Sequence, residues 1–181
     1  MSLARRLAWP LAALASLLYL GALVVQGAMP QQRQLVRFEA KGLLAEPPEA
    51  VRRIELSRGA ERLVLLRRGE GWATGEGRNI GLAAARIDTA LKMLRNSPPV
   101  REIAAADLAG LDAAPFGLDP PAIAVALSGA DDRRLLALRF GARNPEDFLQ
   151  YMRVEGDPRL FLMSRFIGAE WDEAMGAALG P

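Results

Sequence analysis

Six acidic residues that could bind a metal ion lie in turn-rich stretches of the last third of the chain. They are Asp131, Asp132, Glu146, Asp147, Glu155 and Asp157. If several of them meet at one end of a sheet, their oxygens could bind Ca²⁺, which takes roughly six to eight oxygen ligands. No EF-hand spacing is present, so we expect solvated turns and neither a metal ion nor a cofactor.

Catalytic chemistry has few candidates, because the 181-residue chain contains neither cysteine nor histidine. This absence removes disulfides, thiolate and imidazole metal ligands, thiol nucleophiles and histidine bases. Two carboxylates that face each other across a cleft can hydrolyse a glycosidic bond, but spacing along the chain does not show that they meet. A hydrolase that uses Asp or Glu is therefore the disfavoured hypothesis, and we expect that the protein is not an enzyme.

Five glycines precede a predicted helix, as in a phosphate-binding loop: Gly69, Gly71, Gly75, Gly77 and Gly81. Their spacing matches neither G-x-G-x-x-G nor a P-loop, and the acidic residues between them would repel phosphate. The cluster predicts a turn-rich hairpin.

Arginines are concentrated in the first predicted hairpin. Guanidinium groups match carboxylates and phosphates, and arginine and aromatic residues are enriched in protein interfaces. We predict a partner-binding surface made of Arg52, Arg53, Arg58, Arg62, Arg67, Arg68, Trp72 and Tyr151. Three alternatives remain open: the arginines pair with acids of this chain, they face lipid headgroups, or Trp72, Tyr151 and Trp171 pack in the core.

Charge divides the chain into a basic and an acidic half. Residues 51–101 hold eleven basic and five acidic residues, whereas residues 102–181 hold seven basic and thirteen acidic ones. This division predicts either two subdomains that face each other or one domain with an electrical polarity. A nucleic-acid-binding protein would carry a basic patch without a matching acidic half, so we expect no nucleic acid partner.

The periodicity predicts two halves of similar plan, 51–99 and 116–181, each made of antiparallel strands followed by a helix. Strands are expected at 51–57, 62–68, 72–74, 123–128, 135–140, 149–154 and 160–163, and helices at 82–96 and 165–179. The uninterrupted apolar run within 62–68 predicts a strand that is covered on both faces. Ser164 is expected to cap the last helix. The fold class is therefore α+β.

An uncharged run at residues 7–25 predicts a transmembrane helix, because nineteen residues span about 28 Å. We divide the chain into a signal anchor at 1–28, a tether at 29–50 and one domain at 51–181. The anchor residues are expected to be Trp9, Leu14, Leu18, Tyr19 and Leu23. Arg5 and Arg6 precede the run but Arg33, Arg37 and Lys41 follow it, so the count of positive charges does not decide the orientation. The short charged leader before the run resembles an export signal, and on that ground we expect a cytoplasmic N-terminus and a periplasmic domain in a bacterial inner membrane.

The second half carries a family resemblance. Its FGLDPP turn at 116–121, the segment Leu138-Arg139-Phe140-Gly141 and the segment Tyr151-Met152-Arg153 look like a bacterial family, the domain-of-unknown-function family numbered 4340. The order of elements in the first half is also similar. The resemblance covers roughly residues 51–179, and it implies a single-span accessory protein whose genes often lie beside those of ABC-type exporters.

The sequence thus favours a non-catalytic, membrane-anchored accessory or scaffold subunit of a bacterial envelope complex. The expected partner is an ABC-type exporter, besides the lipid bilayer around the anchor. The alternative is an assembly or accessory factor for a periplasmic or membrane-bound cofactor enzyme.

Overall fold

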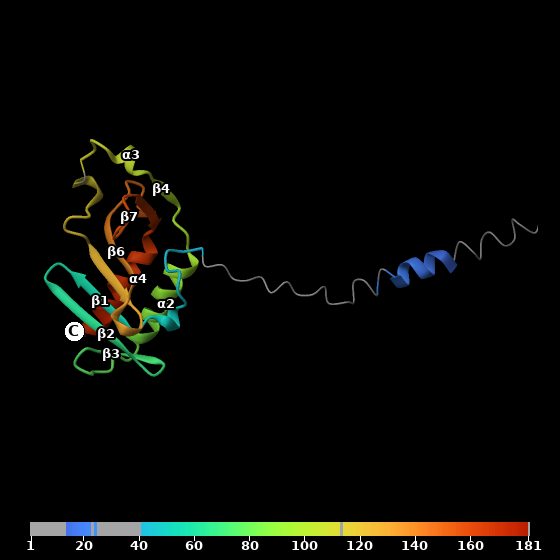
Figure 1. The fold of residues 1–181 in the computed structure, drawn as a ribbon, viewed down its shortest axis with the longest axis horizontal. Coiled ribbons are helices and arrows are strands. Elements are labelled where there is room, and N and C mark those ends of the chain that lie inside the picture. Colours follow the sequence, from blue (N-terminus) through green and yellow to red (C-terminus); the bar gives the residue numbers. More distant parts are fainter. Residues whose placement is uncertain (1–13, 23, 25–40, 113, 181) are drawn as a thin grey trace, which may run out of the picture. The chain divides into compact units, whose positions relative to one another are not determined.

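The computed structural model describes residues 14–22, 24, 41–112 and 114–180 (Figure 1). The chain forms two compact units, Met1–Glu39 and Ala40–Pro181, which are considered separately. In the first unit, residues 14–22 and 24 are helical, and Leu14, Leu18 and Tyr19 are more than half exposed. Trp9, Leu23 and residues 25–40 of the predicted anchor and tether lie outside the described residues. Of the helices that the structure describes, none is long and apolar enough to cross a membrane.

The second unit has the α+β composition that the sequence predicts. Its strands are β1 (Arg53–Arg58), β2 (Glu61–Arg68), β3 (Gly71–Thr74), β4 (Arg101–Ile103), β5 (Ile123–Ser128), β6 (Arg134–Arg143), β7 (Leu149–Val154) and β8 (Leu160–Ser164). Its helices are η1 (Pro48–Ala50), α2 (Ala83–Asn96), α3 (Ala105–Leu108), η2 (Ala114–Phe116), η3 (Ala130–Asp132) and α4 (Arg165–Leu179).

One antiparallel sheet joins both halves of the domain. Its strand order is β3-β2-β1-β5-β6-β7-β8-β4. The halves meet where β1 pairs with β5, with Ile54 opposite Leu127 and Leu56 opposite Val125. Because β1 and β5 also pair with β2 and β6 respectively, the two predicted meanders form one continuous sheet.

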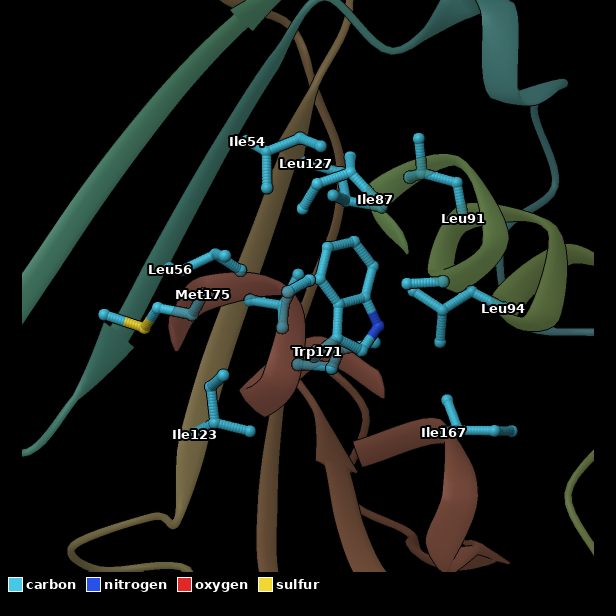
Figure 2. Close-up of a cluster of buried hydrophobic side chains, with 14 of the residues drawn as sticks. Ile54, Leu56, Ile87, Leu91, Leu94, Ile123, Leu127, Ile167, Trp171 and Met175 are labelled. Carbon is cyan, nitrogen blue, oxygen red and sulfur yellow. The ribbon is translucent and has the colours of Figure 1, made fainter. Parts of the chain in front are cut away.

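Helices α2 and α4 pack against each other over one face of the sheet and enclose the core. Figure 2 shows Trp171 of α4 among Ile54 of β1, Leu127 of β5 and Ile87 of α2. Period-two alternation along the strands supplies the sheet side of this core, and a stripe of apolar residues at helical spacing supplies the other side. We refer to the opposite side of the sheet, which α2 and α4 do not cover, as the helix-free face.

Two local expectations were wrong. Strand β2 is not covered on both faces, because Leu63 and Leu65 are buried whereas Val64 and Leu66 on the helix-free face are only half-buried. Ser164 precedes α4 but makes no side-chain capping hydrogen bond. The segment between the halves contains β4, which pairs with β8 at the sheet edge, Arg101 lying opposite Leu162.

The domain begins before the predicted boundary at residue 51. Gly42 donates its backbone N–H to the Arg95 carbonyl at 2.8 Å, and Leu44 donates to the Leu94 carbonyl at 3.1 Å. These bonds satisfy carbonyls at the C-terminal end of α2, which have no partner inside the helix. Leu44 is fully buried, so residues 42–50, assigned to the tether, pack on the domain.

Candidate functional site

Two of the residues predicted to bind a partner, Arg67 and Trp72, belong to a structural cluster with Asp88. The Trp72 side chain is buried and donates its indole N–H to Asp88 Oδ1 at 3.0 Å. The Arg67 guanidinium lies over the indole ring, 4.3 Å from its centroid, and its nitrogens donate to the carbonyls of Pro48 and Val51. Burial lowers the pKa of Arg67, and the charge of Asp88 opposes this shift. These contacts hold residues 48–51, β2, β3 and α2 together.

Replacing Asp88 with alanine should lower the free energy of unfolding by about 1–3 kcal/mol, because it leaves the buried Trp72 N–H without its acceptor and removes the carboxylate that lies 3.7 Å from the Arg67 guanidinium. Chemical denaturation measures the change. Glu70→Ala is the matched control. Glu70 and Asp88 line the same surface hollow, but the Glu70 side chain is exposed. We expect Glu70→Ala to change stability by less than about 0.5 kcal/mol. Equal effects of the two variants would contradict the role given to Asp88.

Arg53 and Arg58 make ion pairs within the domain. Arg53 Nε lies 2.9 Å from Glu55 Oε1 on the same strand. Arg58 binds Glu61 at 2.8 Å and Asp172 of α4 at 2.9 Å, and these hydrogen bonds raise its pKa. The contact with Asp172 is an example of the predicted pairing between the basic and acidic halves. These two arginines thus have partners in their own chain.

Arg52, Arg62 and Arg68 remain exposed. Arg52 lines a hollow of about 360 Å³ beside η1 and α2. Arg62 lies on the helix-free face, in the same cross-strand register as Ser57 of β1. Tyr151 is half-buried and meets the Phe116 ring edge-on, with 5.0 Å between the ring centroids.

The sheet register aligns Arg62 with two arginines that the sequence analysis did not select, Arg139 and Arg153. Ser57 lies opposite Arg62 and Ala124, Ala124 lies opposite Arg139, and Arg139 lies opposite Arg153. Residues opposite each other in an antiparallel sheet point to the same face. We name Arg62, Arg139 and Arg153 the arginine row. Their alternation with Leu138, Phe140 and Met152 in the sequence marks them as facing away from the core.

Three shallow hollows meet at the arginine row. Arg139 lines all of them, with volumes of about 560, 410 and 340 Å³. Arg153 lines the two larger ones, and Arg62 lines the smallest. Small side chains, Ala124, Ala126 and Ala137, form much of the floor of the largest hollow. Within the described residues, none of the three arginines makes an ion pair.

The acidic residues considered for Ca²⁺ do not form a cluster in the described part of the chain, where no group of three or more potential metal ligands occurs. Asp147 binds Arg143 and Arg165. Asp157 binds Arg159, whose side-chain and backbone hydrogen bonds hold the pKa of Asp157 below its ordinary value. Gly71 is the first residue of β3, the other four glycines lie in the turns around β3 and before α2, and Gly69, Gly77 and Gly81 have positive φ. This arrangement is the turn-rich hairpin that the sequence predicts.

Comparisons with protein-family models, with curated proteins and with solved structures return no match to this chain.

Proposed function

We propose that this protein is a non-catalytic accessory or scaffold subunit of a bacterial envelope complex. It is anchored in the inner membrane by residues 1–28, with the domain on the periplasmic side. The observation that carries the proposal is the helix-free face of the sheet. This face combines half-buried Val64, Leu66 and alanine side chains with the exposed arginine row, which makes no ion pair within the described part of the chain. Arginine is enriched in protein interfaces relative to the rest of the protein surface.

Two features of the sequence support the membrane and the partner class. The uncharged run at 7–25 is long enough for a transmembrane helix. The resemblance to the family numbered 4340 favours an ABC-type exporter as the partner. An anchor of this kind would raise the concentration of the domain beside a membrane-embedded partner.

Affinity purification of the full chain with a C-terminal tag, from its native membranes in mild detergent, tests the proposal. Mass spectrometry should recover a permease and an ATPase in fixed ratio to the chain. The variant with Leu14→Arg and Leu18→Arg should lose both the membrane fraction and the partner, since each arginine in mid-membrane costs about 2.5–3.5 kcal/mol. Leu82→Arg is the matched control, because Leu82 is 92% exposed on the domain and should tolerate a charge.

The outcomes separate the hypotheses. Recovery with a periplasmic or membrane-bound oxidoreductase would replace the exporter by the cofactor-enzyme alternative. Recovery of the chain alone, or extraction of the wild-type chain from membranes by alkaline carbonate, would contradict the proposal of an anchored subunit.

A further inference from the structure

We propose that the arginine row binds an extended acidic segment of the partner protein. This inference rests on the proposed function, because it specifies the chemistry that the partner presents to the domain. It starts from a contrast within the fold. Many arginines of the domain bind a carboxylate of the same domain, including Arg53, Arg58, Arg86, Arg143 and Arg159. The three arginines of the row have no such partner among the described residues.

The row places like charges directly opposite each other. Arg139 and Arg153 face each other across β6 and β7, and both are exposed. Like charges in this position destabilise a sheet. A carboxylate that binds between them would remove the repulsion, and guanidinium groups bind carboxylates through two parallel hydrogen bonds. The facing pair Arg139 and Arg153 is therefore more stable when a carboxylate is bound between the two guanidinium groups than in the free protein.

The charged residues around the arginine row give the three hollows a net positive charge. Arg134 lines the largest hollow with Arg139 and Arg153, whereas Glu155 and Asp119 are the acidic residues nearby without an ion pair. Asp157 lines the same hollow, but Arg159 already neutralises it. An anionic partner thus meets four guanidinium groups and two available carboxylates.

The spacing of the row matches an extended chain that crosses the strands. Neighbouring strands lie about 4.8 Å apart, so Arg62 and Arg139, three strands apart, are separated by about 14 Å. Arg153 lies one strand further, about 19 Å from Arg62. An extended peptide rises about 3.3 Å per residue. Acidic residues about four positions apart would therefore reach Arg62 and Arg139, and acidic residues about six positions apart would reach both ends of the row, Arg62 and Arg153.

The lining favours a protein segment over lipid or single-stranded nucleic acid. Membrane-surface binding needs large apolar side chains beside the cations, but the most exposed ones in the domain, including Leu82, Phe148 and Phe166, line none of the three hollows. Single strands need several aromatic platforms, but the only aromatic residue among the described residues that line the three hollows is Phe116, and its ring already packs against Tyr151. The alanine side chains on the floor of the largest hollow leave room for a peptide backbone.

Fluorescence anisotropy with a labelled octaglutamate peptide tests the inference on the full chain in detergent micelles. We expect saturable binding by the wild type, which Arg139→Glu with Arg153→Glu weakens about tenfold or more, because charge-assisted hydrogen bonds are lost. Lys92→Glu on α2 is the matched control and should leave binding unchanged, since Lys92 is exposed on a helix that covers the other face. Arg139→Gln with Arg153→Gln should also weaken binding, and melting curves check that each variant folds.

Each outcome has one meaning. The inference is overturned if octaglutamate does not bind the wild type, or if it binds the double variants as tightly as it binds the control. Tighter binding to phosphatidylglycerol vesicles or to a single-stranded DNA oligomer than to octaglutamate would also overturn it. Loss of octaglutamate binding in both double variants but not in Lys92→Glu supports it. Because this assay needs no natural partner, a chain that purifies alone but binds octaglutamate through the row would contradict the proposed function and leave this inference standing.

Discussion

Replacing Trp171 with alanine is expected to lower the free energy of unfolding by about 3–5 kcal/mol, the range for truncating a buried aromatic side chain. Trp171 is fully buried where α2, α4 and the sheet meet, against Ile54, Ile87 and Leu127 (Figure 2). No other side chain can fill the space without moving a helix, because the core is formed between rigid elements. Equilibrium denaturation by urea, followed by circular dichroism, measures the loss.

Trp171→Phe is the informative comparison, since it keeps an aromatic ring. The indole N–H of Trp171 is buried and has no hydrogen-bond partner within the described residues. Phenylalanine removes this unsatisfied donor, which offsets part of the lost contact area. We therefore expect Trp171→Phe to cost much less than Trp171→Ala. Equal losses of unfolding free energy for the two variants would contradict this expectation.

Replacing Leu44 with alanine is expected to lower the free energy of unfolding by about 2–5 kcal/mol, although the residue lies in the stretch that the sequence assigns to a tether. Leu44 is fully buried, and its backbone N–H donates to the Leu94 carbonyl of α2. The same denaturation experiment measures the change. A loss of this size would establish that the folded domain begins near residue 41.

Leu82→Ala is the control for Leu44→Ala, because it removes the same atoms from a side chain that is 92% exposed. A surface substitution of this kind changes stability by less than about 0.5 kcal/mol. If Leu44→Ala were as mild as Leu82→Ala, the segment at 42–50 would not contribute to the core.

The structure separates arginines with a structural role from arginines that are available to a partner. Arg67 and Arg58 were both predicted at the partner-binding surface, yet each connects parts of the domain, through Asp88 and Asp172 respectively. Arg62 fits the prediction best, because it is exposed on the helix-free face. The concentration of arginines in the sequence therefore pointed to β2, which carries Arg62, but it did not show which arginines form ion pairs within the domain.

Local periodicity was sufficient for most elements. Strands β5 and β7 and helix α4 have the predicted bounds, because alternation of apolar residues every second position, or every third to fourth, depends only on neighbours in the chain. Strand β4 was missed because its three residues carry no clear alternation, and its pairing with β8 stabilises it. The packing of residues 42–50 also depends on a distant segment, the C-terminal end of α2, and local periodicity therefore missed it.

The sequence by itself determined the absence of histidine and cysteine chemistry, the uncharged N-terminal run and the α+β class. Only the tertiary structure decided that β1 pairs with β5, which turns two meanders into one sheet. That pairing aligns Arg62 with Arg139 and Arg153, which are more than seventy residues away along the chain. The physical reason is that strand register is set by contacts between distant segments, whereas the alternation that reveals a strand is local.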